Sequence, residues 1–173
     1  TLHVTGEGTS SATTSLIVEK SDGTDILVVR DDGRVGILDA TPAYPLDVAG
    51  EAAMKHLYSN TSAPTNSLGG ATIVGTGASC TVTGGDIGMN VAFTTGTGVS
   101  AAGTIDTITF NVAYGTAPIA VAFPKNAATA AMFINSELWL ETTATTIVIK
   151  STNNLTSSTT YNFDIVVIGR IAA

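Results

Sequence analysis

Residue types that commonly perform catalysis are scarce in this sequence. It contains two histidines, His3 and His56, and one cysteine, Cys80. A Ser-His-Asp triad needs a histidine in a folded cleft, whereas both histidines lie in segments that we interpret below as a stem and a neck. Cys80 lies in a strand-like run, where we expect a small buried side chain, because a catalytic thiol needs a histidine partner. No zinc-protease, Cys-x-x-Cys or phosphate-loop motif is present. We therefore predict no catalytic residue, no metal site and no cofactor.

Two carboxylates flank the single tryptophan of the chain, in the order Glu137, Trp139 and Glu141. Glycosidases need two carboxyl groups within about 5–9.5 Å of each other. Four residues of a strand span about 13 Å, so these glutamates are a poor acid and base couple within one chain, although a pair across a subunit boundary stays open. An exposed aromatic ring beside carboxylates suits a different task, which is stacking on a sugar ring while the carboxylates accept hydrogen bonds from its hydroxyl groups. The alternative is that Trp139 packs against a neighbouring subunit.

Asparagines in two expected loops are further candidates for contact with a ligand. The loops cover residues 125–131 and 152–158. Loops at the ends of a β-sandwich often carry binding residues, but asparagine is also common in turns for conformational reasons. The predicted binding set is Trp139, Glu137, Glu141, Asn126, Asn153 and Asn154.

Composition limits the classes of protein and of partner. Hydrophobic residues make up 44% of the 173 residues and charged ones only 12%, which indicates a compact chain rather than a disordered one. The net charge of −7 argues against nucleic-acid binding, which needs a basic surface. No run of about 18 apolar residues is present, so we expect no membrane insertion. The chain begins with Thr1 rather than Met, and we expect it to be a fragment of a longer protein.

Charge divides the chain into two modules. Thirteen of the 21 charged residues lie within the first 56 positions, and the remaining 117 positions contain eight. A polar segment with a proline, at residues 59–67, is typical of a linker. We therefore predict a β-stem with a neck at residues 1–58, the linker at 59–67 and a head domain at 68–173.

The first module shows strand and hairpin signals. Its apolar, β-branched runs lie at residues 16–20, 25–30 and 34–37. An Asp-Gly dipeptide lies in each interval, and this dipeptide is favoured in hairpin turns because glycine adopts a positive φ at little cost. About 50 residues of such a meander bury too little surface to be stable alone, and residues 26–29 are apolar on both faces. We therefore expect several copies of this module to intertwine.

A short internal repeat lies in the same module. Residues 2–7 and 46–51 share the pattern Leu-x-Val-x-Gly-Glu, and repeats that stack along an axis are typical of elongated proteins. After the second copy, residues 51–58 have the composition of a helix of about two turns. We expect this short helix to form the neck.

The second module alternates between apolar and polar residues with a period of two. Apolar positions of this kind include Ile108 and Phe110, Leu138 and Leu140, Ile147 and Ile149, and Phe163 and Ile165. About eight such runs, separated by turns rich in glycine, proline and asparagine, predict a β-sandwich or jelly roll. The whole chain is therefore predicted to be all-β.

Residues 32–50 read Asp-Gly-Arg-Val-Gly-Ile-Leu-Asp-Ala-Thr-Pro-Ala-Tyr-Pro-Leu-Asp-Val-Ala-Gly. They resemble a recurring pattern of phage tail-fibre proteins, in which Asp-Gly-x-Val-Gly-Ile-Gly is followed by Thr-x-Pro and Leu-x-Val-x-Gly. The chain departs from this pattern at Leu38, where the family usually has glycine. The second module, at residues 103–110 and 158–169, is similar to the heads that end such fibres. The resemblance implies three parallel chains wound into a stem, a terminal head and attachment to a host surface.

From this resemblance we expect a homotrimeric, non-enzymatic tail-fibre tip on a virion, assembled in the host cytoplasm. Its partner would be a bacterial cell-surface glycan or protein. A bacterial surface adhesin, a capsid-decorating protein and a carbohydrate-binding accessory module of an enzyme are the alternatives. The accessory module differs from the others in being expected as a monomer.

Overall fold

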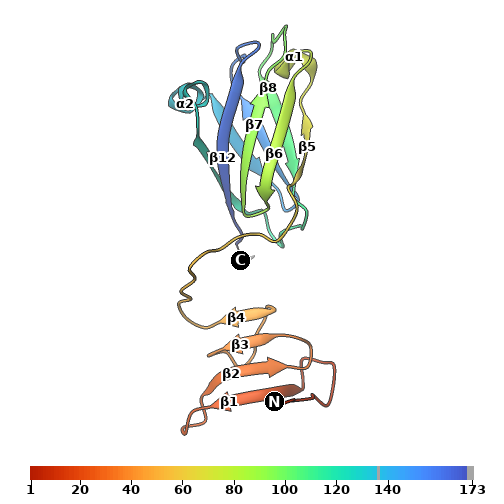
Figure 1. Ribbon diagram of the computed structural model, residues 1–173, viewed down its shortest axis with the longest axis vertical. Coiled ribbons are helices and arrows are strands. Elements are labelled where there is room, and N and C mark those ends of the chain that lie inside the picture. Colours follow the sequence, from red (N-terminus) through yellow and green to blue (C-terminus); the bar gives the residue numbers. More distant parts are fainter. Residues whose placement is uncertain (136, 171–173) are drawn as a thin grey trace. The chain divides into compact units, whose positions relative to one another are not determined.

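A computed structural model describes residues 1–135 and 137–170 of the chain. It divides into two compact units, Thr1–His56 (unit 1) and Leu57–Ala173 (unit 2). The described residues form three four-stranded sheets and two short helices, which confirms the predicted all-β class (Figure 1).

Unit 1 is one four-stranded sheet in the order β1-β2-β3-β4. Its strands are β1 (Thr14–Glu19), β2 (Asp25–Arg30), β3 (Val35–Ile37) and β4 (Leu46–Val48). The first three pair antiparallel through the two Asp-Gly turns, in which Gly23 and Gly33 have φ of 82° and 87°. The meander predicted at residues 16–37 is therefore present. β4 adds a parallel strand to β3, which the sequence analysis did not anticipate.

The connection from β3 to β4 contains the position at which the chain departs from the tail-fibre pattern. Leu38 has φ of 56°, a left-handed conformation that glycine adopts easily and leucine does not. Its backbone N–H donates to the Ile26 carbonyl at 2.9 Å. A Cβ atom on Gly36 would collide with the Asp39 carbonyl oxygen, so the chain folds back tightly here. Leucine therefore occupies a turn whose geometry suits glycine.

Unit 1 has almost no core of its own. Among its residues, all of which the structure describes, Val28 and Pro42 are the large apolar side chains that are fully buried. Ile17, Val18 and Leu46 keep 47%, 42% and 64% of their surface exposed. A β-sheet normally buries its apolar face against a second layer, and unit 1 supplies no such layer.

Residues 51–58 form no helix, so the predicted helical neck is wrong. Eight residues are too few to offset the cost of helix nucleation without tertiary contacts, and Met54 remains 64% exposed. The boundary between the units falls after His56 rather than after residue 58. Strand β5 (Thr65–Leu68) begins inside the segment 59–67 that was predicted as a linker.

Unit 2 is a sandwich of two four-stranded sheets. One sheet has the order β10-β11-β8-β5 and the other β6-β7-β12-β9, and every pairing in them is antiparallel. The remaining strands are β6 (Ser79–Gly85), β7 (Gly88–Thr94), β8 (Gly103–Thr109), β9 (Ile119–Pro124), β10 (Leu138–Thr142), β11 (Thr146–Ser151) and β12 (Thr160–Ile168). The helices are α1 (Ala71–Val74) and α2 (Ala127–Ile134). The predicted sandwich is thus observed, with eight strands in the described part of unit 2.

Alternating residues of both sheets form the core of this sandwich. β12 buries every second residue from Tyr161 to Val167, and β7 buries Met89, Val91 and Phe93. Phe93 and Tyr161 stack with ring centroids 5.2 Å apart. The opposite sheet contributes Ile108, Ile147 and Ile149, all fully buried. Such period-two burial on both inner faces is what makes unit 2 a packed domain.

The strands of unit 2 run between two opposite ends (Figure 1). Its first residues and the end of β12 lie at one end, and α1 and the β11–β12 loop lie at the other.

No helix within the described ranges has the length and apolar character that crossing a membrane requires.

Candidate functional site

Trp139 lies on β10, the edge strand of its sheet, and points out of the sandwich. Leu138 before it is buried, whereas the indole is 38% exposed. This is the orientation that period-two alternation predicted for the tryptophan. Its Nε1 atom donates a hydrogen bond to Oε1 of Glu141 at 3.2 Å. The ring is therefore held by a neighbour on the same strand face, with part of its surface in contact with water.

Glu141 also pairs with a lysine on the neighbouring strand. Lys150 lies directly opposite Trp139 in the β10–β11 register, and its Nζ atom is 2.7 Å from Oε2 of Glu141. The hydrogen bond from Lys150, followed by the one from Trp139, lowers the pKa of Glu141 below its ordinary value. The outer face of β10 and β11 thus carries a fixed row of an ammonium group, a carboxylate and an indole.

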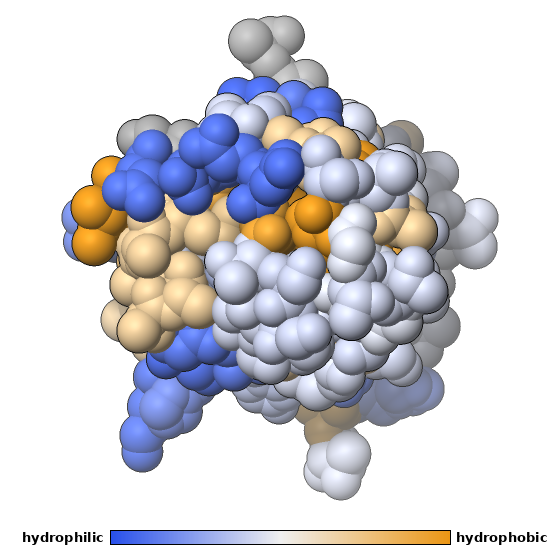
Figure 2. Space-filling model, turned by 90° about the horizontal axis from the view of Figure 1, so that it is seen from above, coloured by the Kyte–Doolittle hydropathy of each residue, from blue (hydrophilic) through white to orange (hydrophobic). Residues whose placement is uncertain are grey.

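Glu137 belongs to a neighbouring but different environment. Its Oε1 accepts a hydrogen bond from Nδ2 of Asn153 at 3.0 Å. Glu137 and Asn154 line a polar hollow of about 290 Å³ between α2 and the β11–β12 loop. The other lining residues are Ala128, Ala131, Met132, Asn135, Leu155, Thr156, Thr159 and Tyr161. Figure 2, which looks onto this end of unit 2, shows a group of hydrophilic side chains beside a pale apolar surface.

Asn126 has a structural task instead. It is the N-cap of α2, because its Oδ1 atom accepts hydrogen bonds from the N–H and the hydroxyl of Thr129 at 2.9 and 2.8 Å. Its Nδ2 atom donates to the Thr160 carbonyl at 2.9 Å. The loop predicted at residues 125–131 is therefore mostly helix, and Asn126 does not line the hollow. Asn immediately before an alanine-rich run is the signal that would have predicted this cap.

Glu137 and Glu141 are engaged in separate contacts. Each has its own partners, which are Asn153 for Glu137 and both Trp139 and Lys150 for Glu141. His3 and His56 both lie in unit 1. In the described ranges, no three side chains of His, Cys, Asp or Glu gather in a way that would hold a metal ion.

Two buried aspartates that the sequence analysis did not single out stabilise unit 2. Asp86 accepts hydrogen bonds from the N–H groups of Asn111 and Val112, both at 3.0 Å, and so fixes the turn after β8. Asp106 is fully buried on β8 and accepts from Nδ2 of Asn66 at 3.0 Å. Burial raises the pKa of Asp106, although hydrogen bonds from Cys80 and Asn66 oppose that shift. Both carboxylates therefore accept hydrogen bonds from other residues of unit 2.

Burial also raises the pKa of the Cys80 thiol, and the nearby Asp106 adds to this effect. Since thiolate is the reactive form, Cys80 has the properties of a structural residue. Cys80 is half-buried on β6, so its side chain is less buried than the sequence predicted.

Comparisons of the chain with protein-family models, with curated proteins and with solved structures give no match. What the site can do is therefore inferred from its own geometry. The row of Trp139, Glu141 and Lys150 offers one aromatic face and charged groups of both signs. Sugars combine apolar C–H faces with hydroxyl groups that donate and accept, and this row matches both features.

Proposed function

We propose that the chain is the host-attachment end of a trimeric fibre, in which unit 1 is part of the stem and unit 2 is the binding head. The observation that carries the proposal is the contrast between the two units. Unit 1 is a single sheet with exposed apolar residues such as Ile17 and Leu46, whereas unit 2 has a complete core. A sheet of this kind gains a second layer when copies of the chain associate, and the resemblance at residues 32–50 suggests three copies.

The partner in this proposal is a glycan of a bacterial cell surface, and Trp139 is its main contact. An aromatic ring fixed by Glu141 stacks on a sugar with little loss of side-chain entropy. Glu137, Asn153 and Asn154 offer further polar contacts in the neighbouring environment. Asn126 contributes indirectly by capping α2. Many weak contacts on one virion add up through multivalency, so a shallow site is sufficient. In this proposal the protein has no enzymatic activity, uses no cofactor and inserts into no membrane.

The proposed setting is the tail fibre of a virion that is assembled in the host cytoplasm. A single cysteine with a half-buried thiol suits folding in a reducing compartment. A bacterial adhesin or a capsid-decorating protein would share the oligomeric build and differ in the particle or cell that carries it.

The first test is the solution mass, measured by light scattering after size-exclusion chromatography. We expect the mass of three chains, and a monomer would refute the fibre proposal and favour the accessory module. The second test is binding to whole bacterial cells. Trp139→Ala is expected to weaken binding at least tenfold without changing the mass, whereas Thr81→Ala, an exposed change on the opposite sheet, should have no effect. If Trp139→Ala lowers the mass instead, Trp139 is an interface residue and the glycan assignment is wrong.

A further inference from the structure

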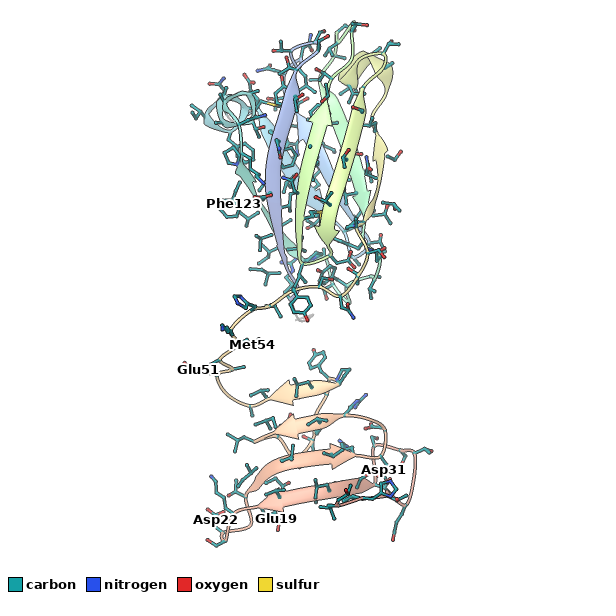
Figure 3. The ribbon with its side chains drawn as sticks, in the orientation of Figure 1. Glu19, Asp22, Asp31, Glu51, Met54 and Phe123 are labelled. Atoms are coloured by element: carbon teal, nitrogen blue, oxygen red, sulfur yellow. The ribbon has the colours of Figure 1, made fainter. Side chains whose placement is uncertain are left out.

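Strand β9 directs its large apolar side chains to the outer face of the sheet, which is unfavourable for a monomeric sandwich. Ala120 and Ala122 are partly buried against the core, whereas Ile119, Val121 and Phe123 face outward and keep 50%, 44% and 53% of their surface exposed. Figure 3 shows the Phe123 ring directed away from the sandwich. An edge strand normally turns its larger apolar residues inward, so this arrangement needs another explanation.

The adjacent strand extends the same apolar face. In the β9–β12 register, Val166 lies opposite Val121 and Ile168 lies opposite Ile119. Val166 and Ile168 are 43% and 57% exposed, although neighbouring β12 residues form the core. Cross-strand pairs on one face touch each other, so these four residues and Phe123 form a continuous apolar stripe.

The stripe continues into an apolar hollow of about 860 Å³ at the end of unit 2 where its first residues lie. Val166 and Ile168 line this hollow together with Leu57 and Tyr58, which are 73% and 79% exposed. At these exposed fractions the seven side chains leave on the order of 700 Å² of surface in water. That area is of the same order as the roughly 800 Å² that each partner contributes to a stable protein–protein interface.

The charge of this face favours a second copy of the chain as its partner. β9 contains no charged residue, and the one on β12, Asp164, pairs with Lys125 at 3.3 Å. The face is therefore close to neutral, although the chain as a whole has a net charge of −7. A second copy approaches such a face without the repulsion that it would meet elsewhere on an acidic protein. A basic partner, by contrast, would find no acidic surface to bind here.

We propose that the outer face of β9 and β12, with the hollow beside Leu57 and Tyr58, is the contact surface between the heads of neighbouring copies of this chain. The inference rests on the multichain state of the proposed function and adds the surface at which the heads meet. Unit 1 holds the copies together, which raises the effective concentration of one head near another. An apolar face of this size is then sufficient to hold the heads together. Association of freely diffusing heads would cost additional translational and rotational entropy.

The test is thiol crosslinking of the full-length chain. Val121→Cys places a thiol in the stripe with little change of volume, and Thr109→Cys places one at an exposed position on the opposite sheet. A bismaleimide is expected to join Val121→Cys chains into covalent pairs, at most two of every three chains, because each chain offers one reactive thiol and each crosslinker joins two. It should leave Thr109→Cys and the parent chain single, because the parent has only the half-buried Cys80 thiol. The double variant Val121→Asp, Phe123→Asp should leave unit 2 folded. It should speed hydrogen exchange of the β9 amides, because a neighbouring copy no longer covers the stripe.

The possible outcomes separate this inference from the proposed function. A mass of three chains without crosslinking at Val121→Cys overturns the head contact and leaves the fibre proposal standing. Crosslinking at Val121→Cys in a protein that binds no bacterial cell supports the contact and contradicts the attachment function. A monomeric parent chain overturns both proposals. Equal crosslinking of Val121→Cys and Thr109→Cys indicates random collision and also overturns the contact.

Discussion

The indole Nε1 of Trp139 donates a 3.2 Å hydrogen bond to Glu141, two residues further along the same strand. The other oxygen of that carboxylate is 2.7 Å from the Lys150 ammonium group. Because Trp139 is the only tryptophan, its fluorescence reports on this one contact and on the folding of unit 2 alone. Trp139 fluorescence can therefore be used to measure changes in the proposed binding row of Trp139, Glu141 and Lys150.

Acid should break the Trp139–Glu141 contact at an unusually low pH. The pKa of Glu141 lies below 4.5 because Lys150 and Trp139 donate to its charged form. Its interactions therefore persist at neutral pH and are lost as pH falls through the lowered pKa. We expect a step in Trp139 fluorescence below pH 4.5 that Glu141→Gln removes and Glu137→Gln retains. A step that survives Glu141→Gln would show that another group quenches the indole.

The buried carboxyl of Asp106 should make unit 2 less stable as pH rises. Burial raises the pKa of Asp106 above 3.8, so the folded state binds a proton more tightly than the unfolded state. The stabilisation is complete below pH 3.8 and is lost as pH increases through the raised pKa. Urea unfolding followed by Trp139 fluorescence should show that Asp106→Asn loses this component of the pH dependence.

A matched variant tests the direction of the Asp106 effect. Asn66→Ala removes the 3.0 Å hydrogen bond to Asp106, which favours the charged carboxyl. The pKa should therefore rise further, and the loss of stability should extend to higher pH than in the parent. An unchanged profile in both variants would mean that Asp106 does not titrate in this range.

Two phenylalanines of the same sheet should differ sharply in their contribution to stability. Phe163 is fully buried in the sandwich, whereas Phe123 is 53% exposed on the adjacent strand. Phe163→Ala should lower the free energy of unfolding of unit 2 by about 3–5 kcal/mol. Phe123→Ala should change it by less than about 1 kcal/mol in dilute solution and act instead on head contacts. Comparable losses would show that the outward face contributes to the fold of a single chain.

Leu38→Gly should stabilise unit 1. Leu38 has φ of 56°, which costs a residue with a Cβ about 1–2 kcal/mol, while glycine adds about 0.4–1 kcal/mol of entropy to the unfolded chain. The net gain is therefore about 0.5–1 kcal/mol, measured as a higher midpoint of the unit 1 transition in thermal circular dichroism. Ile26→Gly, in an ordinary strand conformation, should lower the same midpoint. A lower midpoint for Leu38→Gly would show that packing of the leucine outweighs its strain.

Strand positions followed largely from local pattern. β2 coincides with the predicted run at residues 25–30, and the Asp-Gly pairs form turns with positive φ at Gly23 and Gly33. Period-two alternation also placed Trp139 outside and Leu138 inside the sandwich. These features depend on residues that are neighbours in sequence, so the sequence contains the information.

The errors arose where the outcome depends on distant contacts. Residues 51–58 have a helical composition, but all of them are exposed and they form no helix. Residues 127–134 form α2 because the helix packs against β9 and β12 and Asn126 caps it. The polar hollow exists only because α2 and the β11–β12 loop meet around Glu137.

The sequence by itself determined the all-β class, the two-part organisation, most strands and the outward position of Trp139, because alternation and turn chemistry act over a few residues. Tertiary structure alone decided the parallel pairing of β4, the burial of Asp106 and the partners of Glu137 and Glu141. It also decided that β9 buries Ala120 and Ala122 rather than Val121 and Phe123. Alternation defines two faces of a strand, but which face is buried depends on the strands and copies that lie against it.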